Sequence, residues 1–168
     1  MTPEPVKPAA ELIIREYAPG DGPAFRRLNE EWILRYFALE PKDIETLADP
    51  ERTILAYGGR IFLAVREGEA VGCCALQATG PGEFEVVKMA VTESCQRIGA
   101  GRRLLERAIA DARASGATRL YLETNHKLAP AIRLYESLGF RHIPLERVIP
   151  SPYTRADVFM ELRFENQE

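Results

Sequence analysis

The chain has 168 residues, of which 46% are hydrophobic and 28% are charged. This length and composition predict one globular domain that buries a core without disulfides or a structural metal. We expect residues 11–168 to form it, after a loose tail of residues 1–10 that contains three prolines. The formal net charge is −3, whereas a general nucleic-acid binder needs an excess of clustered lysine and arginine. Nucleic acid is therefore not an expected partner.

The cysteines and histidines predict neither a disulfide framework nor a metal site. Cys73 and Cys74 are neighbours in a predicted strand and so point to opposite faces of a sheet. His126 and His142 lack the spacing of metal ligands. No stretch reaches the roughly 18 apolar residues of a transmembrane helix, and the proline-bearing start is unlike a signal peptide. We expect a cytoplasmic protein with no metal and no membrane partner.

The N-terminal third of the chain predicts one strand followed by two helices. Residues 12–17 read as a strand, and Asp21 with Pro23 can cap and begin a helix. Apolar residues recur at intervals of three and four up to Tyr36, which indicates a buried stripe along that helix. A second, short helix is expected over residues 41–48.

The middle of the chain predicts three strands. Residues 61–66 and 70–78 flank a Glu-Gly-Glu turn and indicate a β-hairpin. A Gly-Pro-Gly turn at residues 80–82 then leads into a strand over residues 84–91.

The last third alternates between helices and strands. A long amphipathic helix follows residue 99 and closes at Ser115 and Gly116, because glycine favours the end of a helix. A strand, a second helix and two further strands complete the chain, over residues 118–123, 130–138, 140–143 and 158–164.

The most informative motif is QRIGAG, residues 96–101, which joins a predicted strand to the long helix. The first turn of a helix leaves up to four N–H groups without an internal partner, and glycine lets the backbone approach an anion closely. Arg97, Arg102 and Arg103 add positive charge to the same turn. The motif indicates a diphosphate-binding turn, with the alternative that the glycines only cap and pack the helix.

Two common nucleotide-binding motifs are excluded at this turn. A Rossmann fingerprint requires a third glycine where Leu104 stands. A P-loop requires lysine followed by serine or threonine, where Arg102 and Arg103 stand. NAD and ATP are therefore not the expected ligands.

The same motif resembles the Q/R-x-x-G-x-G/A turn of the GCN5-related N-acetyltransferases, the GNAT family. Residues 123–140, ETNHKLAPAIRLYESLGF, resemble the strand, helix and strand that follow it in that family. The resemblance, good over residues 61–143, implies an α/β (α+β) fold whose mixed, mostly antiparallel sheet has about seven strands, about four flanking helices and a cleft between splayed central strands. It also implies transfer of an acetyl group from acetyl-CoA to a primary amine of a small molecule or protein, by direct attack on the thioester.

The resemblance further implies which residues hold acetyl-CoA. Backbone groups at Met89 and Val91 would pair with the pantetheine arm, and amides of the glycine turn would bind the diphosphate. That turn comprises Gln96, Arg97, Ile98, Gly99, Ala100, Gly101 and Arg102. Asn125 would also bind the pantetheine arm, although this chain has Leu128 where the family's common pattern has its asparagine.

The reaction implied by the resemblance needs a base and an acid. A primary amine with a pKa of about 10.4 is unprotonated in only about one molecule in 10³ at pH 7. Glu85 lies six residues before Val91, where histone-type members carry the general base, and Glu123 is the alternative. Tyr135 matches the family's helix tyrosine and would give a proton to the departing thiolate.

The amine acceptor itself has no sequence signature. In the resembling fold, the first two helices and the last hairpin surround its site, and here they offer Glu30, Glu31, Trp32, Tyr36, Phe37 and Tyr153. Carboxylates beside aromatic rings suit a cationic amine, although the same residues can serve as core and as solvated helix surface. The resemblance favours a homodimer and leaves acyl-chain preference open. The alternative function is a non-catalytic acyl-CoA-binding domain that senses or regulates.

Overall fold

A computed structural model describes residues 2–5 and 10–165 of the chain. Within the tail expected over residues 1–10, residues 1 and 6–9 lie outside the described part, and the others have no regular secondary structure.

One sheet of seven strands forms the centre of the described molecule, in the order β1-β2-β3-β4-β5-β7-β6. Its strands are β1 (Leu12–Glu16), β2 (Arg60–Arg66), β3 (Glu69–Gly80), β4 (Glu83–Val91), β5 (Arg119–Thr124), β6 (Arg141–His142) and β7 (Val158–Arg163). Neighbours are antiparallel except β4 and β5, which are parallel. The predicted mixed, mostly antiparallel sheet is confirmed.

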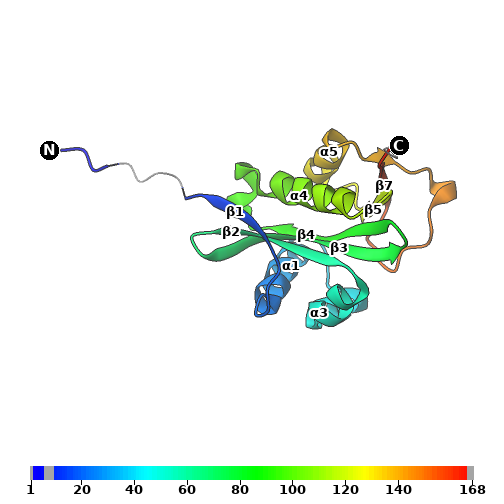
Figure 1. Cartoon of the computed structure of the whole chain (residues 1–168), viewed down its shortest axis with the longest axis horizontal. Helices are drawn as coiled ribbons and strands as arrows, with labels where there is room; N and C mark the ends of the chain where they lie inside the picture. Colours follow the sequence, from blue (N-terminus) through cyan, green and yellow to red (C-terminus); the bar gives the residue numbers. More distant parts are fainter. Residues whose placement is uncertain (1, 6–9, 166–168) are drawn as a thin grey trace.

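Helices cover both faces of this sheet (Figure 1). The α-helices are α1 (Gly22–Tyr36), α2 (Pro41–Ala48), α3 (Pro50–Thr53), α4 (Ala100–Ala114) and α5 (Ala129–Ser137), and the 3-10 helices are η1 (Leu55–Tyr57), η2 (Glu93–Ile98) and η3 (Leu145–Arg147). Helices α4 and α5 lie on one face, and α1 and α3 lie on the other. The short α3 and the 3-10 helices were not predicted. None of the helices in the described ranges is long and apolar enough to cross a lipid bilayer.

The expected cap at the start of α1 is wrong in its detail. Asp21 occupies the N-cap position, but its carboxylate makes no capping bond to the described first turn of α1. It accepts hydrogen bonds from the guanidinium of Arg15, at 2.7 and 3.0 Å, and from the backbone N–H of Ala18. The carboxylate therefore ties the helix entry to the end of β1.

Two separate cores lie on the two faces of the sheet. Leu104, Leu105 and Ala108 of α4 pack with Cys74 on one face. Phe25 of α1 packs with Cys73 on the other. The prediction that the adjacent cysteines face opposite sides is confirmed.

A β-bulge interrupts β4 at Lys88. The pairing with β3 shifts between Cys73 and Ala75, and Lys88 adopts a positive φ of 52°. Val86 and Met89 pack on the α4 face, whereas Val87 packs on the α1 face. Strict alternation would turn Lys88 toward α4, but the extra residue re-aims the strand, and the Lys88 ammonium instead bonds to Asp43 of α2.

The parallel pair β4 and β5 separates halfway along its length. Their pairing runs from Glu83 opposite Arg119 to Val86 opposite Leu122, and goes no further among the described residues. Beyond that point Val87, Ala90 and Val91 of β4 pair with β3 alone. This separation is the splay that the resemblance implied, and it positions the candidate site.

Candidate active site

The splayed strands frame a cavity of about 480 Å³. Ten of the predicted site residues line it: Glu85, Met89, Val91, Gln96, Arg97, Gly99, Gly101, Arg102, Asn125 and Tyr135. Ile98 and Ala100 are not among the described residues that line it. Ile98 is 44% exposed, and Ala100 is buried in the α4 core. Of the expected acceptor residues, Trp32, Phe37 and Tyr153 line the cavity, and Glu30, Glu31 and Tyr36 do not.

The start of α4 forms one end of this cavity. Gly99 is the N-cap residue and adopts the left-handed conformation, with φ at 81°, which glycine adopts without the Cβ clash of other residues. No side chain in the described part of the chain caps the helix. A Cβ added to Gly101 would meet the Met89 Cε at 3.5 Å, so helix and strand approach closely here. The first-turn amides remain open to an anion.

The edge of β4 that faces β5 leads away from the start of α4 along the cavity. Beyond Val86 that edge has no strand partner among the described residues, so its backbone groups can pair with an extended ligand. The Gln96 side chain donates a 3.4 Å hydrogen bond to the Val91 carbonyl. This hydrogen bond links the glycine turn to the open edge of β4.

Glu85 lies on β4 just before the strands separate, opposite Gln77 of β3 and Tyr121 of β5. Burial raises the pKa of its carboxyl to about 7, and the nearby Glu123 adds to the rise, against the opposing effects of Lys88 and Lys42. A base whose pKa lies near the working pH combines a useful ionised fraction with useful basicity.

Glu123 also lines the cavity, at the end of β5, but its carboxylate oxygens already have partners. One accepts a 3.1 Å hydrogen bond from the Tyr121 hydroxyl, and the other accepts a bond from the Ser151 hydroxyl. Each oxygen thus already accepts a hydrogen bond within the protein, whereas no described residue donates one to the Glu85 carboxylate. The geometry favours Glu85 over Glu123 as a base.

Tyr135 extends from α5 on the opposite side of the cavity. Its ring is buried and contacts Phe140 edge-on, with centroids 5.9 Å apart. Burial raises the pKa of the phenol well above its usual value, so the hydroxyl keeps its proton throughout the neutral range. Since this hydroxyl bonds to none of the described residues, its proton is available to a ligand.

Asn125 is buried at the end of β5, where its carboxamide bonds to the protein. The amide group donates to the Arg155 carbonyl at 2.8 Å, and the oxygen accepts from the Lys127 backbone N–H at 2.9 Å. One amide hydrogen and one carbonyl lone pair remain. Its predicted contact with a cofactor stays a prediction.

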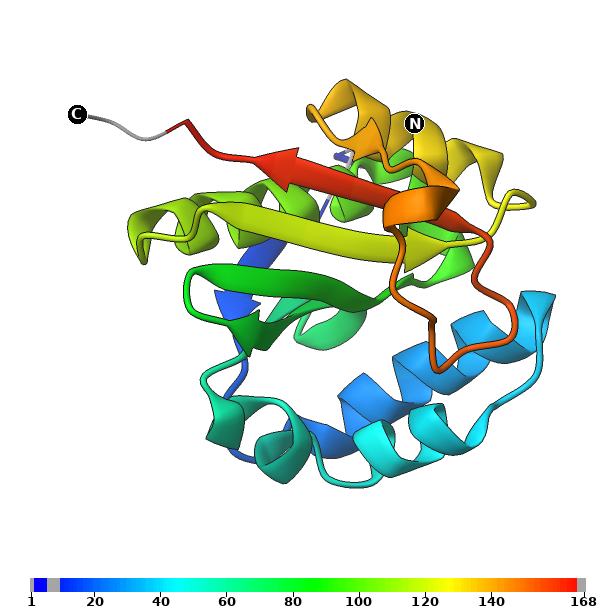
Figure 2. The ribbon, with the colours of Figure 1, turned by 90° about the vertical axis from the view of Figure 1, so that its right-hand side faces the viewer.

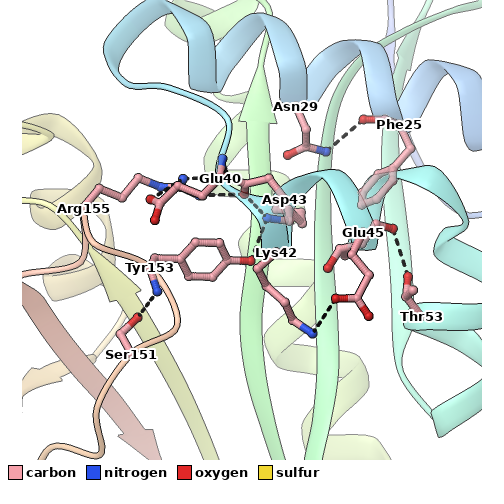
Figure 3. Close-up of polar contacts among 12 residues, drawn as sticks. Phe25, Asn29, Glu40, Lys42, Asp43, Glu45, Thr53, Ser151, Tyr153 and Arg155 are labelled. Carbon is pink, nitrogen blue, oxygen red and sulfur yellow. Dashed lines mark hydrogen bonds and ion pairs between the residues drawn. The ribbon is translucent and has the colours of Figure 1, made fainter.

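A buried ion cluster beside the cavity was missed from the sequence. Asp43 of α2 is fully buried and accepts hydrogen bonds from Lys88 at 2.6 Å and from Arg155 at 2.7 and 2.8 Å. Arg155 also donates to Glu40 at 3.1 Å, and Lys88 donates to the Tyr153 hydroxyl at 3.1 Å. Figure 3 shows Arg155 and Tyr153 reaching from the last loop toward α2.

These ionic contacts control the charge of Asp43. Burial by itself would raise the pKa of this carboxyl, but hydrogen bonds from Arg155 and Lys88 outweigh it and lower the pKa to about 2. The spacing of Glu40 and Asp43 is the one available sequence signal, because the two residues form a capping box around the start of α2. Nothing in the spacing indicates that Lys88 or Arg155 would join them.

The chain belongs to the acetyltransferase (GNAT) family, whose model matches residues 25–140. It is 32% identical over 139 residues to YjgM, an uncharacterized N-acetyltransferase of Escherichia coli (strain K12), covering 78% of this chain and 83% of that protein. It is 39% identical over 99 residues to an IAA acetyltransferase of Azospirillum brasilense. That match covers 58% of this chain and 60% of the relative, so this chain spans only part of the relative's length. A GNAT-family acetyltransferase structure from Staphylococcus aureus Mu50 has the same fold, with a TM-score of 0.84, 20% identity and coverage of 92% of this chain and 100% of that one.

Proposed function

We propose that the chain transfers an acetyl group from acetyl-CoA to a primary amine, by direct attack of the amine on the thioester. One observation carries this proposal: a single cavity brings together the open start of α4, Glu85 and Tyr135. Membership of the GNAT family supports the choice of acetyl-CoA as the acyl donor.

The cofactor's diphosphate would lie on the first-turn amides of α4, beside Arg97 and Arg102. The helix dipole contributes about 0.3–1 kcal/mol, and each charge-assisted hydrogen bond contributes about 1.5–3 kcal/mol. A few such bonds are enough for micromolar binding, which requires about 8 kcal/mol. The pantetheine arm would then run along the open edge of β4, near Met89 and Val91.

The chemistry follows from the two ionisable groups on either side of the thioester. The amine nitrogen attacks the thioester carbonyl, a C–N bond forms, and the C–S bond breaks. Glu85 takes the proton that the amine loses, directly or through a water. The electron pair of the broken bond goes to sulfur, where the Tyr135 hydroxyl stabilises the thiolate by hydrogen bonding and supplies its proton.

Release of CoA thiol from acetyl-CoA tests this proposal in the presence of a panel of primary amines. The expected result is that at least one amine releases thiol faster than the hydrolysis blank and is recovered as its N-acetyl product. Hydrolysis-level rates with every amine would overturn it. If CoA nevertheless raised the thermal stability, as ligand at about 100 times its Kd would by about 2.7 kcal/mol, the non-catalytic acyl-CoA-binding function would replace it.

A further inference from the structure

A second cavity, of about 700 Å³, lies on the α1–α3 face of the sheet. Its lining residues come from α2, α3, η1, β3, β4 and the last loop, and they include Lys42, Glu45, Arg52 and Gln77. Glu85, Val87, Lys88 and Tyr153 line the first cavity as well. The two cavities therefore meet at the candidate base.

The second cavity reaches Glu85 from the α1–α3 face of the sheet, whereas the first cavity extends from α4 and α5 across to α1, where Trp32 and Phe37 line it. Val86 packs toward α4 and Val87 toward α1, so alternation along the strand turns Glu85 to the α1 face. Tyr135 belongs to the core on the α4 face. In Figure 2 the loop that follows η3 descends past the ends of β5 and β4 toward α1 and α2. Direct transfer requires the acyl donor and the amine to be bound at the same time. The proposed function places the acyl donor on the α4 face.

The charged groups of the second cavity differ in how well they are neutralised. Lys88 is buried and contacts Asp43 at 2.6 Å. Lys42 and Arg52 are about half exposed or more, and their carboxylate partners, Glu45 and Asp49, lie 3.8 and 3.7 Å away. Figure 3 shows the Lys42–Glu45 pair. Exposed pairs at such distances contribute little energy, so both cations can exchange their partners for an anionic ligand.

We infer that the second cavity is the acceptor subsite and takes a small molecule carrying both a primary amine and a carboxylate. The amine faces Glu85, and the carboxylate faces Lys42 and Arg52. This inference rests on the proposed function, because it assumes that the first cavity holds the acyl donor. The field of Lys42 already reaches Glu85, whose pKa it lowers, so the two ends of one small molecule can contact both groups.

A matched acceptor series tests the chemical class. Glycine, β-alanine, 4-aminobutyrate and 6-aminohexanoate are each compared with the corresponding carboxamide, in an assay of CoA release. At the best chain length, kcat/KM for the carboxylate should exceed that for the carboxamide about tenfold, and Lys42→Gln or Arg52→Gln should reduce this preference about five- to tenfold. The carboxamide rates should hardly change. Arg26→Gln on α1 is the matched control, because Arg26 lines neither cavity.

The location is tested separately by filling the cavity. Gln77 lines it and lies opposite Glu85 on β3, whereas Thr79, on the same strand, does not line it. Gln77→Trp should raise the acceptor KM about tenfold or more without changing the thermal shift with CoA, whereas Thr79→Trp should leave both unchanged. Equal rates for carboxylates and carboxamides, acetylation of peptides alone, or an unaltered acceptor KM in Gln77→Trp would overturn the inference while the proposed function stands. Hydrolysis-level rates with every amine would overturn both.

Discussion

Glu85 must be ionised to act as the proposed base, but burial of its carboxyl disfavours the ionised form. Its pKa of about 7 arises from burial and from the neighbouring Glu123, so near neutral pH the carboxyl exists in both forms. The ionised form is the base, and it is also the form that the partly buried site disfavours.

The first prediction concerns the pH dependence of activity. For wild type, kcat/KM should rise as the pH increases and level off above an apparent pKa near 7, because only ionised Glu85 accepts a proton. Glu85→Gln should lower kcat about 10²- to 10⁴-fold and remove this acidic limb. An unchanged pH profile in Glu85→Gln would assign the base to another group, and Glu123→Gln then identifies it.

The second prediction concerns stability at the same residue. Because the folded-state pKa of Glu85 is raised, its contribution to stability is complete below pH 4.5 and is lost as the pH rises through about 7. By linkage the loss is at most about 3 kcal/mol at pH 8. Glu85→Gln should therefore gain stability over wild type between pH 5 and pH 8, measured by urea unfolding. A difference between the two proteins that does not vary with pH would show that Glu85 titrates normally.

The third prediction concerns Tyr135. Tyr135→Phe removes one hydroxyl and keeps the buried ring against Phe140, so the fold and the affinity for CoA should change little. The kcat should fall about 10²- to 10⁴-fold, which is the range that general-acid assistance contributes. Tyr17→Phe is the control, because Tyr17 bonds to Glu51 and lines neither cavity. Equal effects of both substitutions would contradict a chemical role.

At the scale of elements, the two ends of α4 provide a matched comparison. Gly99 at its start and Gly116 after its end have φ values of 81° and 85°. A Cβ added to either meets no atom within 4 Å. An alanine at either position therefore carries backbone strain alone.

The fourth prediction uses this pair. Gly99→Ala and Gly116→Ala should each lower the free energy of unfolding by about 1–2 kcal/mol. Only Gly99→Ala should also weaken CoA binding, by about tenfold, because strain there displaces the amides proposed to hold the diphosphate. Isothermal titration with CoA separates the two outcomes. Equal losses of affinity in both variants would remove the glycine turn from the cofactor site.

The bulge in β4 lets consecutive residues of one strand contact opposite faces of the sheet. Without the extra residue at Lys88, the ammonium would point into the apolar core under α4, where an unpaired charge is very costly. With it, Met89 contacts the start of α4 while Lys88 reaches Asp43. The bulge lies just beyond the point where β4 and β5 separate, and it places a cation on the face opposite α4.

At the scale of the whole molecule, the Asp43 cluster joins parts of the chain that are far apart in sequence. Lys88 lies 45 residues from Asp43, and Arg155 lies 112 residues from it. The cluster fastens the loop that carries Tyr153 to α2 and β4 (Figure 3). It therefore sets one wall shared by both cavities.

The fifth prediction follows from the charge of this cluster. Asp43→Asn leaves two cations with insufficient counter-charge and should lower the free energy of unfolding by about 3–5 kcal/mol at pH 7. Glu31→Gln, in an exposed ion pair with Arg27 on α1, should cost less than about 1 kcal/mol. A small effect of Asp43→Asn would show that water reaches the cluster.

Acid should weaken the wild-type cluster as well. The pKa of Asp43 is lowered to about 2, so its contribution to stability is present above about pH 4 and is lost as the pH falls toward 2. By linkage this loss amounts to about 2 kcal/mol. Asp43→Asn should lack that part of the acid dependence in urea unfolding between pH 4 and pH 2.

Much of the fold could be predicted because its signals are local. The apolar repeats placed α1 and α2, and the bounds of α2 agree with the prediction residue for residue. Glycine and proline marked the turns, and the QRIGAG motif placed the start of α4 at the cavity. Each signal depends on residues within a few positions of one another, where backbone conformation is decided.

The remainder depended on contacts that neighbouring residues do not determine. The bulge at Lys88 arises from pairing with β3, and the acceptor for the Asn125 amide group, the Arg155 carbonyl, lies in a loop 30 residues away. The sequence by itself determined most of the helices and strands and the glycine turn before α4, because backbone propensity and apolar periodicity are short-range properties, and resemblance to a known family supplied the expected arrangement of the sheet. Only the tertiary structure decided which charges are neutralised, how the pKa of Glu85 is shifted and where the second cavity opens, because burial and electrostatic interactions depend on distances in space.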